Sequence, residues 1–308
     1  MTIVKYLNPR NDIAFKKIFG TEKNKDILMH FLNDVIEREG KKEITKVRLL
    51  NPMQHPELIG KKQSVVDVLC EEEDGTQYIV EMQVAKVGGF EKRAQYYAAK
   101  AYSSQAEEGY NYDHLKEVIF LAITEYEMFP KKKGYKSVHY TLDKKTYERD
   151  LKDFSFTFIE LKKFNKRIEE LKSFEDKWCY FFKYANDPDD MGELIKNSDE
   201  VITKAYHELE AHHWTKDELR AYEASEKIAR DNKAREAYLE GLAEQAELRG
   251  IEKGIEKGRE EGREEGIKKG KIERNYEIAK NMLSHNISAE IISQSTGLSI
   301  DEINNLKN

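Results

Sequence analysis

The stretch TQYIVEMQVA, residues 76–85, alternates as regularly as any part of the chain. In an extended strand one side would carry Gln77, Ile79, Glu81 and Gln83, and the other side the apolar Tyr78, Val80, Met82 and Val84. A carboxylate among apolar residues constrains the fold, because it needs a partner when it is buried. The pattern therefore predicts a β-strand in which Glu81 and Gln83 have a role other than packing.

The preceding run QSVVDVLCEE, residues 63–72, predicts a second strand that forms a hairpin with the first. A two-residue loop would set Asp67 against Met82, on the wrong side of the sheet. A three-residue loop that ends in Gly75, with this glycine in the left-handed conformation, sets Asp67 directly opposite Glu81. We expect the three-residue loop, since Glu-Asp-Gly suits a type I turn followed by glycine. The two carboxylates would then be about 5 Å apart at Cβ.

Asp67 would share its face of the strand with Val65 and Leu69, which disfavours the alternative of two acids facing solvent on an edge hairpin. Two carboxylates in such surroundings repel each other and need a cation or a shared proton. Oxygen ligands suit Mg²⁺ or Mn²⁺, which keep several waters and take phosphate oxygens as further ligands. The pair therefore indicates metal-dependent hydrolysis of a phosphodiester, with Gln83 placed to hold the attacking water or a phosphate oxygen.

Helices and strands around the hairpin are predicted in the order helices, three strands, helix, strand. The ranges are helices at 11–20 and 25–38, strands at 44–52, 63–72 and 77–85, a helix at 90–109 and a strand at 116–124. Further along, 137–146 and 154–161 are strand candidates, the chain beyond Phe164 is mostly helical, and 186–190 is a break.

Four motifs in this order carry a resemblance to a known family: NPRNDIAFKKIFG, VVDVLC, YIVEMQ and FEKRAQYYAAKAY. The D-x13-E-x-Q pattern on a hairpin between two helices resembles the core of PD-(D/E)XK nucleases. Together the motifs resemble the Rpn family of recombination-promoting nucleases and transposase-like proteins, over about residues 5–130. The resemblance implies an α/β fold, a restriction-endonuclease-like αβββαβ core, with a long helical C-terminal extension.

The resemblance also implies an activity, namely a Mg²⁺-dependent (or Mn²⁺-dependent) DNA endonuclease that hydrolyses double-stranded DNA in recombination, mobile-element movement or defence against foreign DNA. It makes Asp67 and Glu81 the metal-binding acids, and it makes Asp12 from the first helix a further metal ligand. Gln83 occupies the position that a catalytic lysine usually holds. The residues expected near the scissile phosphate are Lys16, Arg93 and Tyr97.

Gln83 departs from the family pattern, because an amide can only donate or accept hydrogen bonds where a lysine brings charge. Either the amide is tolerated, or Lys16, Lys86 or Arg93 supplies the charge. Otherwise the protein is a catalytically weak DNA-binding or regulatory protein that self-associates through its C-terminal helix. Simpler roles also remain open: Asp12 as a helix N-cap, Lys16 as its i,i+4 partner and Arg93 in a salt bridge.

The last third of the chain separates from the nuclease-like part by composition. We expect a domain at 1–215, a charged helix at 216–281 and a short helix-turn-helix-like hairpin at 282–308, with Ser288 and Ser299 as N-caps and Gly297 at the turn. The helix carries glycine at every fourth position from Gly250 to Gly270. It is either a spacer or a close-packed pair between the subunits of a homo-oligomer, most simply a dimer. The hairpin either packs or binds DNA.

Composition excludes several other classes. The formal net charge of −6 gives no overall basic signature, so DNA contact requires a local patch. Cys70 and Cys179 form neither a disulfide framework nor a CxxC metal site. No apolar run reaches the length of a membrane-spanning helix, so we expect a cytoplasmic protein without membrane contact. The histidines at 207, 212 and 213 are interpreted as side chains of a charged helix rather than as metal ligands.

Overall fold

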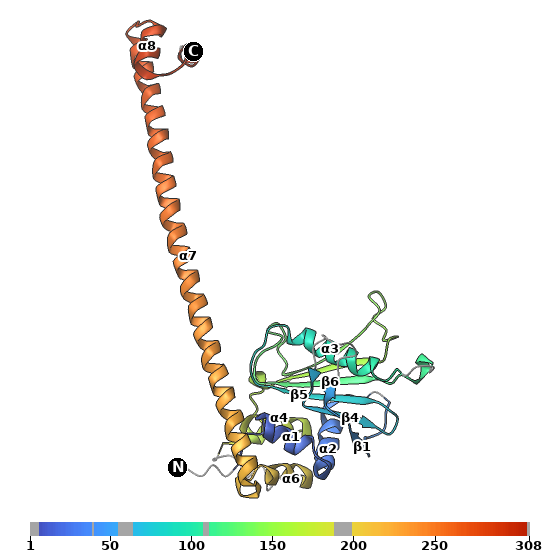
Figure 1. Cartoon of the computed structure of the whole chain (residues 1–308). Helices are drawn as coiled ribbons and strands as arrows, with labels where there is room; N and C mark the ends of the chain where they lie inside the picture. Colours follow the sequence, from blue (N-terminus) through green and yellow to red (C-terminus); the bar gives the residue numbers. More distant parts are fainter. Residues whose placement is uncertain (1–5, 39, 55–63, 107–110, 188–198, 307–308) are drawn as a thin grey trace. The chain divides into compact units, whose positions relative to one another are not determined.

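The computed structural model of the chain describes residues 6–38, 40–54, 64–106, 111–187 and 199–306. Its centre is one six-stranded sheet with the order β1-β4-β5-β6-β8-β7 (Figure 1). The strands are β1 Val47–Leu49, β4 Val68–Glu72, β5 Gln77–Gln83, β6 Val118–Thr124, β8 Phe154–Glu160 and β7 Lys136–Tyr140. A separate two-stranded ladder joins β2 Met53–Gln54 to β3 Ser64–Val65.

The sheet is mixed, since β6 pairs in parallel with β5 and β8 while the other neighbours are antiparallel. All seven residues of β6 are buried, as expected for a continuous apolar run in the middle of a sheet covered on both faces. The α/β fold expected from the motifs is thereby confirmed, and the sheet extends beyond the expected core by β7 and β8, the two later strand candidates.

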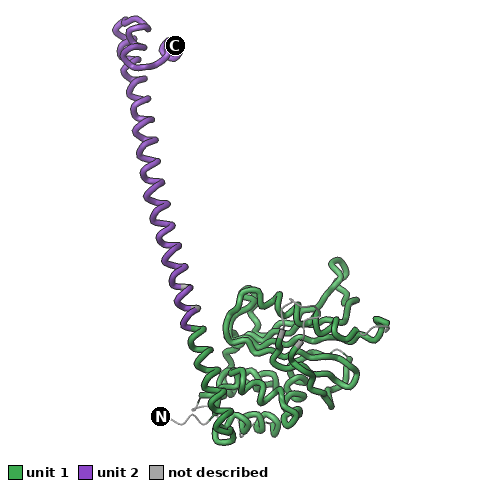
Figure 2. Tube along the Cα trace, in the orientation of Figure 1, with its two compact units in different colours: residues 1–233 green, residues 234–308 purple. Residues whose placement is uncertain are grey.

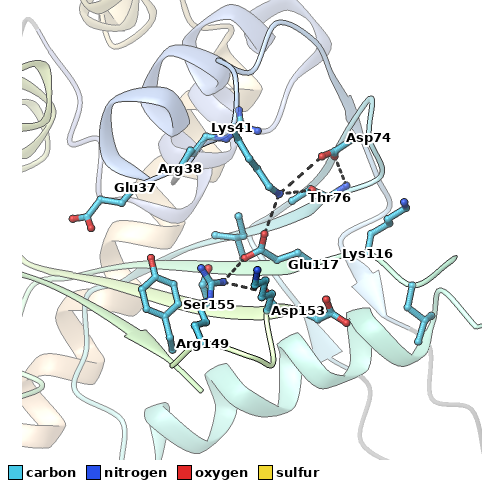
Figure 3. Close-up of a pocket in the computed structure, with 14 residues that line it drawn as sticks. Glu37, Arg38, Lys41, Asp74, Thr76, Lys116, Glu117, Arg149, Asp153 and Ser155 are labelled. Atoms are coloured by element: carbon cyan, nitrogen blue, oxygen red, sulfur yellow. Dashed lines mark hydrogen bonds and ion pairs between the residues drawn. The ribbon is translucent and has the colours of Figure 1, made fainter. Parts of the chain in front are cut away.

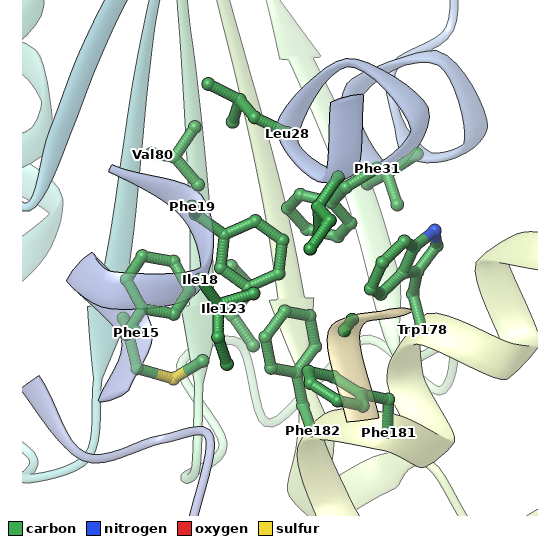
Figure 4. Close-up of a cluster of buried hydrophobic side chains, with 14 of the residues drawn as sticks. Phe15, Ile18, Phe19, Leu28, Phe31, Val80, Ile123, Trp178, Phe181 and Phe182 are labelled. Atoms are coloured by element: carbon green, nitrogen blue, oxygen red, sulfur yellow. The ribbon is translucent and has the colours of Figure 1, made fainter. Parts of the chain in front are cut away.

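Four helices cover one face of the sheet: α1 Asp12–Phe19, α2 Lys25–Val35, α4 Phe174–Tyr184 and α6 Glu200–Glu208. Their aromatic side chains interlock beneath β5 and β6, with Phe19 within 6 Å, ring centre to ring centre, of Phe15, Phe31, Trp178 and Phe182 (Figure 4). Short 3₁₀ turns link the elements at Glu22–Asn24 (η1), Tyr112–His114 (η2), Leu161–Lys163 (η3), Ile168–Glu170 (η4) and Ala211–His213 (η5).

Helix α3, Phe90–Ser103, covers the other face through Phe90, Ala94, Ala98 and Ala101. These side chains pack against Ile79 of β5 and Phe120 of β6, whereas Tyr78, Val80 and Met82 face the four-helix side. The alternation in residues 76–85 therefore separates the two hydrophobic layers. Glu81 and Gln83 lie on the side of the sheet that α3 covers.

Two strand predictions need correction. The strand expected at 44–52 is β1 followed by β2, and the strand expected at 63–72 is β3 and β4, separated by a bend at Asp67. The bend turns Val66 rather than Val65 into the layer beneath α3, while Val65 is exposed. Of the break expected at 186–190, residues 188–190 lie outside the described residues.

The chain divides into two compact units, residues 1–233 and 234–308 (Figure 2). The predicted charged helix is continuous as α7, Lys216–Ser284, and crosses this boundary. In the second unit α8, Ala289–Thr296, and α9, Ile300–Asn305, pack against the end of α7 through Ala279, Ile292, Leu298 and Ile303. Ser288 and Ser299 are the N-caps and Gly297 has φ +74°, as predicted.

Within the described ranges, no helix combines the length and the apolar content that crossing a bilayer would require.

Candidate active site

The turn between β4 and β5 sets the register of the hairpin. Gly75 has φ +90° and donates its N–H to the Glu72 carbonyl at 3.0 Å, which closes a three-residue loop. The strands then pair Val68 with Val80 and Leu69 with Ile79. Continued by one residue, this register sets Asp67 opposite Glu81, as the turn chemistry predicts.

The side chains of Asp67 and Glu81 meet at the bend before β4. The Asp67 N–H donates to Glu81 Oε1 at 3.1 Å, and the Met82 N–H donates to Asp67 Oδ2 at 2.9 Å. Each carboxylate thus takes the place of a backbone partner, which explains why the predicted strand is broken at this point. Both acids are largely buried, and Asp67 also lies within reach of Lys16 of α1.

Burial raises the pKa of both acids. For Glu81, burial and the adjacent charge of Asp67 raise the pKa to about 8. For Asp67, burial raises the pKa, although the Met82 N–H and the ammonium of Lys16 oppose the shift. The nearby ammonium of Lys16 only partly offsets the burial of the two adjacent carboxylates, so a further cation placed between them would stabilise their ionised forms.

Helix α1 brings Asp12 and Lys16 to the same place. Lys16 Nζ lies 2.6 Å from Asp12 Oδ1 and 3.5 Å from Asp67 Oδ1. Burial disfavours the ammonium, but the two carboxylates outweigh that effect and raise the pKa of Lys16. The N-cap of α1 is Asn11, whose side chain accepts from the N–H of Ile13 at 2.9 Å. The interpretation of Asp12 as the N-cap is wrong, whereas the i,i+4 pair with Lys16 is confirmed.

The end of β5 and the first turns of α3 bring Gln83, Arg93 and Tyr97 together. Arg93 donates from Nη2 to the amide oxygen of Gln83, and Gln83 Nε2 donates to the Ala85 carbonyl at 2.8 Å. The guanidinium lies 5.9 Å from the Tyr97 ring centre. Burial raises the pKa of Tyr97, Arg93 opposes the shift, and Glu81 and Asp67 add to it. The seven predicted site residues thus form two sets, Asp12, Lys16, Asp67 and Glu81 on one hand and Gln83, Arg93 and Tyr97 on the other, and the charge of Arg93 acts on Glu81. Lys86, the other cation considered, is exposed in the segment after β5.

Two neighbours of the site were not predicted. Arg10 Nη1 contacts Glu125 Oε1 at 3.0 Å, and the Glu125 N–H donates to the Gln83 carbonyl at 3.1 Å. This pair joins the loop before α1 to the ends of β5 and β6. The available signal was the position of Glu125, which directly follows a buried parallel strand.

A cavity of about 560 Å³ lies at the other end of the hairpin, beside Asp74 and Thr76 (Figure 3). Some of its charges are paired with one another: Glu117 contacts Lys41 at 3.0 Å and Arg149 at 2.8 Å. The Asp67–Glu81 pair is not among the residues that line it. This cavity therefore does not belong to the candidate active site.

Asp12, Asp67 and Glu81 offer only oxygen atoms as ligands, which suits Mg²⁺ or Mn²⁺ better than a softer metal. Lys16 already places one positive charge between Asp12 and Asp67, at the position where a cation is needed. The adjacent carboxylates of Asp67 and Glu81 therefore suit a divalent ion in the kind of donor they offer, whereas Asp12 is held in its ion pair with Lys16.

A comparison with protein-family models matches residues 9–238 to the PD-(D/E)XK nuclease family transposases. Searches of curated proteins and of solved structures gave no match. The matched range contains all seven site residues and the whole of the six-stranded sheet.

Proposed function

Because this chain belongs to the PD-(D/E)XK nuclease family transposases, we propose that it is a Mg²⁺- or Mn²⁺-dependent endonuclease that hydrolyses double-stranded DNA. Recombination, mobile-element movement and defence against foreign DNA are the processes in which such a cytoplasmic enzyme would act. The observation that carries the proposal is the meeting of the Asp67 and Glu81 carboxylates at one buried point, beside a lysine and an arginine.

Asp67 and Glu81, with Asp12 from α1, would hold the ion. When bound, it supplies charge stabilisation at phosphorus and activates water for attack. Glu81 has one oxygen engaged by the Asp67 N–H, and Asp67 has one engaged by the Met82 N–H. These backbone contacts orient the two carboxylates before any ligand arrives, which lowers the cost of assembling the site.

Arg93 supplies the positive charge that Gln83 lacks. Its guanidinium is held by the Gln83 amide oxygen and lies 4.7 Å from the ring centre of Phe90, so it has little freedom to move away. A guanidinium in this position can donate two parallel hydrogen bonds to a phosphate. Gln83 is then a positioning residue, and Lys16, whose Nζ lies 3.5 Å from Asp67 Oδ1, is a second cation.

The proposal is tested by nicking of supercoiled plasmid in Mg²⁺, Mn²⁺ or EDTA. Asp67→Asn and Glu81→Gln keep the shape of each side chain and remove its charge, so we expect each to lower cleavage by at least about 100-fold. Glu73→Gln is the matched control, because Glu73 lies in the same hairpin but is exposed. Cleavage that survives both site substitutions would contradict the assignment of the site.

The second candidate is a DNA-binding or regulatory protein with weak or no catalysis. The neutral Gln83 favours it, because the usual lysine is absent. DNA binding by the wild type without nicking in any metal would support this candidate over the nuclease.

We also propose that the chain self-associates through α7, most simply as a dimer. The helix is 69 residues long, and three of its large apolar side chains, Leu248, Ile251 and Ile255, are more than half exposed. A Cβ added at any glycine from Gly250 to Gly270 would meet nothing within 4 Å in the single chain. A second helix packed there would explain why glycine recurs at these positions, because glycine lets two helix backbones approach closely.

A further inference from the structure

Three histidines surround one buried carboxylate where α6 leads into α7. His207 lies in the last turn of α6, Glu210 follows it, and His212 and His213 belong to the 3₁₀ turn η5. The prediction that these histidines lie on the charged helix is wrong, since α7 begins at Lys216. The sequence interpretation also missed Glu210, which the fold places between them.

Glu210 is 7% exposed and contacts all three imidazoles. Its Oε1 lies 3.3 Å from His207 Nδ1, and its Oε2 lies 3.3 Å from His212 Nε2 and 3.7 Å from His213 Nδ1. One ligand atom from each of Glu210, His212 and His213 falls within 4.8 Å of the other two. The imidazoles are at least half exposed, so an ion in solution can reach them.

Within the described part of the chain, the carboxylate of Glu210 has no lysine or arginine partner. Among residues 6–38, 40–54, 64–106, 111–187 and 199–306, no lysine or arginine lies within 4 Å of its carboxylate. The ring centres of His212 and His213 are 4.0 Å apart, so both imidazoles lie on one side of the carboxylate. One divalent ion would neutralise the carboxylate and leave both imidazoles uncharged, which is the state in which histidine binds metals.

The surrounding contacts orient the histidines as metal ligands usually are. His213 Nδ1 lies 3.0 Å from the backbone oxygen of His207. A carbonyl oxygen can only accept, so this contact places the proton on Nδ1, the atom that also lies 3.7 Å from Glu210 Oε2, and His213 would bind an ion through Nε2. Histidine ligands commonly donate their second N–H to a backbone carbonyl in this way. The backbone of Glu210 is itself fixed by its bridge to Tyr6.

We propose that Glu210, His212 and His213 bind a transition-metal ion of the Zn²⁺ class, with His207 supporting the carboxylate from the other side. Two nitrogens and one oxygen suit Zn²⁺, Co²⁺ or Ni²⁺, whereas Mg²⁺ prefers the oxygen-only set at Asp67 and Glu81. Three protein ligands leave a position open for water. The ion joins the segment paired with Tyr6 to the turn that precedes α7, and it stabilises that junction.

The test uses the full chain without a polyhistidine tag, freed of metal by dialysis against EDTA. Co²⁺ is titrated while its visible absorption is followed, and Zn²⁺ is then added as a competitor. We expect one Co²⁺ per chain with the visible spectrum of an imidazole-bound ion, displaced by Zn²⁺, and a higher Tm in Zn²⁺. The double substitution His212→Ala, His213→Ala should weaken binding at least tenfold and abolish the rise in Tm.

Two controls separate this site from others. His285→Ala removes an exposed histidine of the second unit and should leave Co²⁺ binding unchanged. Asp67→Asn with Glu81→Gln removes the candidate nuclease site and should leave the imidazole-bound Co²⁺ spectrum intact, so the result does not depend on nuclease activity. Absence of Co²⁺ binding in the wild type, or equal binding after the double histidine substitution, would overturn the proposal.

Discussion

The contact between Gln83 and Arg93 gives Gln83 a different role from the one that the sequence alone indicates. In the sequence it stands where the family pattern has a lysine, so it marks a missing charge. In the folded chain its amide oxygen accepts a hydrogen bond from Arg93, and its amide nitrogen is bound to the Ala85 carbonyl. An amide at this position holds a cation from the next helix, whereas an ammonium would repel it.

We therefore expect Gln83→Lys to lower DNA cleavage by about tenfold or more, because the new ammonium and the Arg93 guanidinium would compete for one place. The swap Gln83→Lys with Arg93→Gln should recover part of the loss, since one cation is again present. The measurement is single-turnover cleavage of a plasmid in Mg²⁺. A gain in rate from Gln83→Lys alone would mean that the amide is a poor substitute for lysine.

The raised pKa of Glu81 predicts how the stability of the metal-free protein depends on pH. Its pKa is about 8 in the folded chain and near 4.5 when exposed, so the folded state retains a proton that the unfolded state releases between these values. The free energy of unfolding should fall as pH rises through this window. The free energy of unfolding of the wild type, relative to that of Glu81→Gln, should change by more than about 1 kcal/mol between pH 5 and pH 8.5.

Urea denaturation in EDTA at several pH values measures this effect. Glu73→Gln serves as the control, because that acid is exposed and should leave the wild-type pH dependence unaltered. Identical curves for wild type and Glu81→Gln would show that Glu81 titrates normally.

At the scale of elements, local chemistry made the hairpin predictable. The Glu-Asp-Gly loop fixes the register through Gly75, and the register alone brings Asp67 to Glu81. The bend at Asp67 was not predictable, because it arises when side chains replace backbone partners across two strands. The contact of Arg93 with Gln83 likewise needs α3 to be docked on the sheet.

The structure of the junction between α6 and α7 could likewise not be predicted from the local sequence. The run from His207 to Trp214 has a helical composition, and nothing in it signals that Glu210 pairs with the backbone at Tyr6. The pairing is formed between segments about 200 residues apart in the chain. The burial of Glu210 can therefore be recognised only from the folded structure.

Substitution of glycines in α7 distinguishes a helix that is only a spacer from one that packs closely against a second helix. Gly258→Ala with Gly262→Ala should stabilise an isolated helix by about 1 kcal/mol per site, because alanine is the better helix former. In a close-packed pair the added methyl groups would separate the backbones, so we expect the substitutions to weaken the oligomer. Analytical ultracentrifugation measures the mass in solution. An unchanged mass, together with higher helicity, would instead support the spacer.

At the scale of the whole molecule, the family match and the division into units nearly coincide. The match ends at residue 238, and the first unit ends at residue 233. The first unit contains the sheet and the candidate active site, and the second contains most of α7 and the hairpin packed on its end. The residues of the candidate active site all lie in the first unit, and the second unit is the part for which we propose self-association.

The central claim is that Asp67 and Glu81 together bind a divalent ion, and anomalous diffraction from crystals soaked in Mn²⁺ tests it most directly. We expect a manganese peak between the Asp67 and Glu81 carboxylates in the wild type and no peak there in Asp67→Asn. A wild-type crystal in which Mn²⁺ occupies other carboxylates and leaves this pair without an ion would contradict the account.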